Sequence, residues 1–145
     1  WIMKANVPAP IKLSEAIRLA LKDQLAVEKI PGMGIEMESW HDPHPRRGGC
    51  DVCFAGAVMH QRFDLCMSKL VDGYNIFILF GAAWHRVFMA LNSVRNGHVD
   101  IALGYMGVHV DGTVEDVYVE PYCNSRAKFR KAMRGIATML EEKGL

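Results

Sequence analysis

Apolar side chains recur at a helical period in three long stretches of the chain. The first stretch, at about 13–29, has leucine or isoleucine at every fourth residue. The second, at about 77–95, is rich in aromatic residues, and the third lies at about 125–143. Each pattern predicts a helix with one face in a core. The predicted core stripes are Leu13, Ile17, Leu21 and Leu25; Phe77, Phe80, Trp84, Val87, Phe88, Leu91 and Val94; and Phe129, Met133, Ile136 and Leu140.

Residues that cap or stop helices stand at the ends of these stretches. Ser14 is the expected N-cap of the first helix, and Asn124 or Ser125 that of the last, because their side-chain oxygens accept backbone hydrogen bonds. Gly97 and Gly144 stand where the second and the third helix are expected to end, since glycine favours the left-handed conformation found there. These residues predict the boundaries of the helices.

A shorter helix is predicted from about Phe54 to Phe63, where Ala, Val and Met follow helical spacing and proline is absent. Asp51 is expected near the start of this helix, where its negative charge suits the helix dipole. This helix would begin directly after the two cysteines Cys50 and Cys53. The reactivity of the cysteines would therefore depend on their place next to the N-terminal end of a helix.

Other short stretches predict a small β element. Residues 34–40 alternate between apolar and polar side chains, which indicates a short strand. Residues 108–118 have the pattern of a hairpin around the turn Asp111-Gly112. Residues 98–105 fit either a strand or a further helical turn. Together the patterns predict an α+β fold that is mostly helical, with about four helices and a small two- or three-stranded β element.

Composition favours one globular domain over residues 1–145. Half of the 145 residues are hydrophobic, which is enough to build one core. The formal net charge is +1, which argues against nucleic acid as the partner. The longest apolar run, at 74–84, is too short to cross a membrane, and no signal-peptide pattern is visible. Four cysteines in this length suit a reducing compartment, so a cytoplasmic location is expected.

The most unusual chemistry lies in the segment 36–63. His41, His44, Cys50 and Cys53 provide four possible zinc ligands within thirteen residues. A second interpretation gives Cys53 a lowered thiol pKa at a helix N-terminus, which would make it a nucleophile or a redox centre. A third, which we favour, treats Cys53 as a small buried hydrophobe and expects no metal or cofactor. In that case the loop would present Trp40, Arg46 and Arg47 to a partner.

The last predicted helix carries a stripe of arginines. Arg126, Arg130 and Arg134 are spaced four apart and therefore line one helical face. Such guanidinium groups can bind phosphates or a partner rich in carboxylates. The alternative is a solvated face whose charges pair with acidic residues just upstream, namely Asp111, Glu115, Asp116 and Glu120.

Several motifs resemble one group of proteins. These are Trp40-His41, the run CDVCFAGAVM at 50–59, and two weaker pieces at 88–97 and 129–145. They look similar to small accessory proteins encoded by bacteriophages and prophages, and they cover about a third of the chain. The resemblance implies a protein in the cytoplasm of an infected bacterial host that inhibits or diverts a host defence system. It transfers no catalytic residue.

A second resemblance concerns Cys53 and the segment 97–104, which contains His98. These pieces look like the cysteine and histidine segments of NlpC/P60-type cysteine peptidases. That family uses a thiolate to attack an acyl carbon and a histidine as the base. The chain departs from the pattern at Phe54-Ala55, since the family has a small residue and then glycine directly after the nucleophile.

Two functions are therefore expected to compete. The favoured one is a binding protein that occupies a host protein or a small anionic ligand, with a homo-oligomer as an open possibility and no membrane partner. The alternative is a hydrolase that uses Cys53 and His98.

Overall fold

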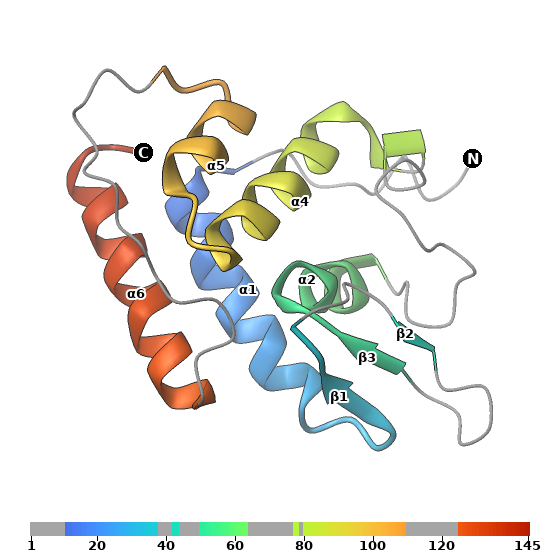
Figure 1. The fold of residues 1–145 in the computed structure, drawn as a ribbon. Coiled ribbons are helices and arrows are strands. Elements are labelled where there is room, and N and C mark those ends of the chain that lie inside the picture. Colours follow the sequence, from blue (N-terminus) through green and yellow to red (C-terminus); the bar gives the residue numbers. More distant parts are fainter. Residues whose placement is uncertain (1–10, 38–41, 44–49, 64–76, 79, 110–124) are drawn as a thin grey trace.

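Helices form most of the described part of the chain, and a small sheet lies beside them (Figure 1). The computed structural model describes residues 11–37, 42–43, 50–63, 77–78, 80–109 and 125–145. The helices in these ranges are α1 (Leu13–Val27), α2 (Phe54–Phe63), α4 (Ala82–Arg95), α5 (Val99–Tyr105) and α6 (Arg126–Glu142). The strands are β1 (Met33–Ile35), β2 (Asp42–Pro43) and β3 (Cys50–Val52). The prediction of a mostly helical α+β chain with a small β element is confirmed.

Helix α1 packs against α2, α4 and α6 and therefore occupies the centre of the arrangement. Leu13, Ile17 and Leu21 are buried, as predicted, but Leu25 is 41 % exposed. The physical reason is the pitch of the helix. Four residues turn by about 400°, so a spacing of four drifts by about 40° at each step. Three steps carry Leu25 roughly 120° away from Leu13, out of the core.

The first and the last helix begin differently. Lys12 precedes the first residue of α1, and its backbone N–H donates to Oε2 of Glu15 at 3.4 Å. The prediction of Ser14 as N-cap is wrong, because this residue lies inside α1 and is buried. Ser125 does cap α6, since its Oγ accepts from the backbone N–H of Lys128 at 3.4 Å. The alternative cap, Asn124, lies outside the described residues.

The predicted helix at 77–95 is interrupted at Gly81. This residue has φ +88° and ψ 168°, a conformation that side chains disfavour, and α4 begins only after it. The aromatic stripe is buried from Phe80 onward, whereas Phe77 is 47 % exposed. Gly97 (φ +87°) ends α4, as predicted. The ambiguous segment 98–105 is helical and forms α5, which packs against α4.

The three strands form one sheet in the order β1-β3-β2. Strand β3 pairs in parallel with β1 and antiparallel with β2. Asp51 therefore lies in the central strand, three residues before the first residue of α2 and so near the start of that helix, as expected. Its backbone is aligned with Gly34 of β1 and Asp42 of β2. The hairpin predicted at 108–118 lies mostly outside the described residues.

One main hydrophobic core joins the helices. Phe54 of α2 meets Phe129 of α6 edge to face, with ring centroids 5.5 Å apart. Phe63, at the end of α2, contacts Phe80 and Trp84, with centroids 4.2 and 5.3 Å away. A separate small cluster of Val27, Val52 and Ala57 holds the sheet against the helices. Within the described residues, no helix combines the length and the apolar character needed to cross a bilayer.

Candidate functional site

Helix α1 has an outer stripe that the core does not use. Arg18, Lys22, Leu25 and Lys29 are exposed and recur at intervals of four, three and four. This spacing places them on one side of the helix, or just past its end for Lys29. One face of helix α1 is therefore buried in the core, and the opposite face carries an exposed basic stripe that contains one leucine.

Helix α6 runs alongside α1 in the opposite direction (Figure 1). Two sets of ion pairs join the helices in this antiparallel arrangement. Near one end, Nε of Arg18 lies 2.6 Å from Oε1 of Glu141, and the Arg18 guanidinium also donates to Thr138 at 3.1 Å. At the other end, Oε1 of Glu28 accepts from Arg126 at 3.1 Å and from Arg130 at 2.5 Å.

A groove of about 500 Å³ lies between these two sets of ion pairs. We call it the α1–α6 groove. Its apolar lining comes from Leu21, Leu25 and Ala26, all on α1. Among the described residues, the rest of its lining is cationic: Arg18, Lys22, Lys29 and Arg134. The groove thus combines an apolar floor with a positively charged rim.

The charges of the groove are unequally neutralised. Arg18 is paired with Glu141, and the hydrogen bond from Arg18 lowers the pKa of that carboxyl group. The side chains of Lys22, Lys29 and Arg134 form no ion pair or hydrogen bond with another residue in the described ranges. Three cations that face one hollow repel one another, so an anion that binds there is stabilised by all three.

A second hollow of about 480 Å³ continues from the groove, since Arg18 and Lys22 line both. Arg62 and Trp84 belong to its other side. Arg62 is paired with the buried carboxylate of Asp23, with Nε 3.2 Å from Oδ2. Burial raises the pKa of Asp23, and Arg62 partly offsets this effect. The second hollow is therefore less strongly positive than the α1–α6 groove.

The predicted arginine stripe divides between two roles. Arg126 and Arg130 hold Glu28, so the structure places them in a pairing with α1, and Arg134 lines the groove. The predicted contact residues of the loop, Trp40, Arg46 and Arg47, lie outside the described residues. Their role stays a prediction.

Sequence reasoning missed the α1 half of the groove. The signal was present in Lys22 and Lys29, which stand seven residues apart in a helix whose other face is apolar. The spacing of four places Leu25 in the core stripe, and this interpretation separates it from Lys22 and Lys29. Once Leu25 is placed on the outer side, the three residues form one surface pattern.

Cys53 lies immediately before α2 and is fully buried, with 0 % of its surface exposed. Its sulfur accepts from the backbone N–H of Gly56 at 3.5 Å and lies 3.8 Å from Oδ1 of Asn92. Burial raises the pKa of the Cys53 thiol, and Arg95 and the N–H groups of Gly56 and Ala55 only partly oppose this shift. The predicted lowering of this pKa at a helix N-terminus is therefore outweighed by desolvation.

The cysteine–histidine pair of the alternative hydrolase is not brought together in the environment of Cys53. His98 is exposed at the start of α5, and the groups that act on the thiol are Arg95, Gly56 and Ala55 together with Asn92. A buried sulfur of this kind offers no approach for an acyl substrate. The site instead has the character of the small buried hydrophobe that we favoured.

The possible zinc ligands lie mostly beyond the described residues. His41 and His44 are not described, and of Cys50 only the backbone is. Among the residues that are described, no group of three or more histidine, cysteine or acidic side chains is arranged to hold a metal ion. Zinc binding by His41, His44, Cys50 and Cys53 stays a prediction.

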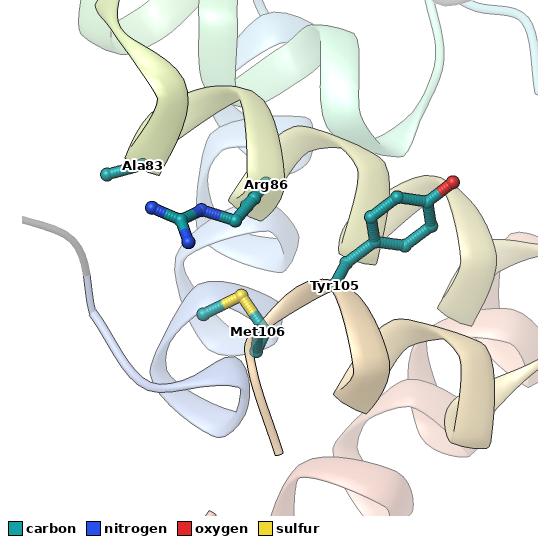
Figure 2. Close-up of a pocket in the computed structure, with 4 residues that line it drawn as sticks. All are labelled: Ala83, Arg86, Tyr105 and Met106. Carbon is teal, nitrogen blue, oxygen red and sulfur yellow. The ribbon is translucent and has the colours of Figure 1, made fainter. Parts of the chain in front are cut away.

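A smaller hollow of about 210 Å³ lies between α4 and the end of α5 (Figure 2). Figure 2 shows the guanidinium of Arg86 turned toward Ala83 and the thioether of Met106 on the facing segment, while the ring of Tyr105 points away. Among the described residues that line it, Arg86 alone is charged. This hollow is therefore a weaker candidate for ligand binding than the α1–α6 groove.

Comparison of the chain with models of known protein families, with curated proteins and with solved structures found no match. The fold and the site alone therefore define the class of protein. It is a mostly helical α+β protein with a basic, apolar-floored groove between two antiparallel helices. The resemblance to phage accessory proteins stays a prediction.

Proposed function

We propose that this chain is an accessory protein that acts by binding an anionic partner, which is a host protein or a small anionic ligand. The observation that carries the proposal is the α1–α6 groove, where Lys22, Lys29 and Arg134 surround an apolar floor. The resemblance to phage accessory proteins agrees with such a role. Binding by this surface would occupy or divert the partner without any catalytic step.

Electrostatics supports a binding function at this surface in particular. The whole chain has a formal net charge of only +1, so its attraction for anions is local rather than global. Glu28 and Glu141, which pair with arginines at the two ends of the groove, are already engaged in ion pairs. These two carboxylates, already neutralised by arginines, therefore compete little with an anionic partner for the positive rim.

The proposal is tested with fluorescent poly-L-glutamate as an anionic probe. We expect saturable binding to the wild-type chain in a low-salt buffer of about 50 mM, followed by anisotropy. Lys22→Glu and Arg134→Glu should each weaken binding by at least about tenfold, since each replaces attraction with repulsion. Circular dichroism would verify that the variants remain folded.

The matched control is Lys128→Glu, which makes the same change of charge at an exposed residue of α6 that does not line the groove. We expect it to bind the probe within about twofold of the wild type, because its charge faces elsewhere and is screened by salt. Equal losses in all three variants would mean that net charge alone controls binding. That result, or an absence of binding by the wild type, would overturn the proposal.

A further inference from the structure

The floor of the α1–α6 groove requires more of a partner than negative charge. Leu25 is 41 % exposed and stands between Lys22 and Lys29, and Leu21 and Ala26 extend the apolar lining. A purely anionic ligand would neutralise the rim and leave this apolar surface against polar groups. A ligand that also places an apolar side chain on Leu25 removes that surface from water.

The spacing of the rim restricts the shape of the ligand. Lys22 and Lys29 are seven residues apart, which corresponds to about two helical turns or about 10 Å along the axis of α1, with Lys29 two residues past the end of that helix. Leu25 lies between them, three residues after Lys22, and Arg134 faces the groove from α6. A helix lying along the groove has the same repeat: two acidic residues seven apart and an apolar residue three or four positions from either.

The two ends of the groove limit how far the acidic stretch extends. Glu141 lies near one end with Arg18, and Glu28 lies at the other with Arg126 and Arg130. These carboxylates already form ion pairs with the neighbouring arginines. They would repel acidic groups of a ligand that extended past either end of the groove. The complementary negative charge is thus confined to about two helical turns.

We infer that the α1–α6 groove holds an acidic amphipathic helix of a protein partner, which presents the pattern Glu-x-x-Leu-x-x-x-Glu or its reverse. This inference rests on the proposed function and names the partner of the same site. A nucleic acid suits the groove less well, because its long run of phosphates would pass Glu28 and Glu141 and would leave Leu25 uncovered. The inserted leucine distinguishes a protein helix from every other polyanion.

The probes are three synthetic peptides of about 18 residues, long enough to form a helix. One carries the pattern, the second has its leucine replaced by alanine, and the third has the same composition with one glutamate moved to the opposite face. At about 0.15 M salt, the first should bind the wild-type chain at least about tenfold more tightly than either of the others. Anisotropy with labelled peptides measures this.

Variants of the chain show whether the binding uses the groove. Leu25→Ser should weaken binding of the patterned peptide. It should not affect the peptide with alanine in place of leucine, because that peptide already lacks the contact with Leu25. The control Ile101→Ser changes a leucine-sized side chain on α5 that is 47 % exposed, and it should have no effect. Lys22→Glu should abolish binding, and a peptide in which one glutamate becomes lysine should restore it.

The outcomes separate this inference from the proposed function. If all three peptides and poly-L-glutamate bind equally well, the groove is a general anion site and the helical partner is wrong. A single-stranded oligonucleotide that displaces the patterned peptide at equal concentration would make nucleic acid the partner and would also overturn the inference. If no anionic probe binds, the proposed function fails as well.

Discussion

The thiol of Cys53 illustrates how burial and local dipoles compete at one residue. Its sulfur accepts from a backbone N–H at the start of α2, and Arg95 is near, and both features favour a thiolate. Full burial favours the neutral thiol and dominates, so the pKa of Cys53 is raised. In chemical terms, this cysteine is part of the core.

We therefore predict slow alkylation of Cys53 in the folded chain. Between pH 7 and pH 9 the unfolded chain should react faster as the thiol ionises near its ordinary pKa of about 8.5. Because the folded-state pKa is raised, the folded chain should hold less thiolate at each pH and react at least about 100-fold more slowly. Site-resolved mass spectrometry after a pulse of iodoacetamide measures both rates. Equal rates at pH 7 would restore the hydrolase alternative.

Glu28 is the second residue whose environment leads to a prediction. Its Oε1 forms ion pairs with two arginines. Arg130 is only 15 % exposed, and Arg126 is more exposed. Glu28→Gln should lower the free energy of unfolding by about 1–3 kcal/mol, mainly because Arg130 loses its charged partner in a partly buried place. The pair with Arg126 should add little, since that side chain is well solvated. Urea unfolding measures the change.

Glu142→Gln is the control for this prediction. Glu142 ends α6 and is exposed, and the described residues give it no ion pair. Its substitution should change the free energy of unfolding by less than about 0.5 kcal/mol. If both variants lose the same amount, the Glu28 pair does not contribute to the docking of α6 on α1.

At the scale of elements, the break before α4 depends on one backbone conformation. Gly81 has φ +88°, and a Cβ added there would meet no atom of the described residues within 4 Å. Gly81→Ala should therefore cost about 1–3 kcal/mol from backbone strain alone. Gly135→Ala in α6, where the space is also open and φ is ordinary, should stabilise the chain by about 0.5–1 kcal/mol. Thermal unfolding should show a lower melting temperature for Gly81→Ala and a higher melting temperature for Gly135→Ala.

Helices could be predicted from the sequence where the hydrophobic pattern was long enough to repeat. The stripe from Phe129 to Leu140 and the end of α4 at Gly97 follow from helical spacing and from glycine. The error at Leu25 arose because a spacing of four is longer than a helical turn. Strands β2 and β3 have two and three residues, too few for any alternation to show, and their pairing is set by neighbours.

The groove was not predictable, because it belongs to no single element. Lys22 and Arg134 lie on different helices, more than 100 residues apart, and their proximity depends on the antiparallel register of α1 and α6. The arginine spacing on α6 identified Arg134 but also two residues that serve a structural pairing. Only the packing of the two helices separates these roles.

At the scale of the whole molecule, one core connects the helices, so unfolding is expected to be cooperative. Phe54→Ala removes a fully buried ring that contacts Phe129 and should cost about 3–5 kcal/mol. Phe77→Ala, at a residue that is 47 % exposed, should cost less than about 1 kcal/mol. Urea unfolding followed by fluorescence and by circular dichroism should give coincident transitions for the wild type and both variants. Separate transitions would show that the helices do not unfold as one cooperative unit.

The ion pairs between α1 and α6 join residues that are 98 to 123 positions apart. A ribosome has therefore made nearly the whole described chain before the second wall of the groove exists. Closing a loop of this length also costs conformational entropy before these contacts can form. The newly made protein would thus remain unable to engage an acidic partner during synthesis, and would acquire that ability in one step when α6 docks.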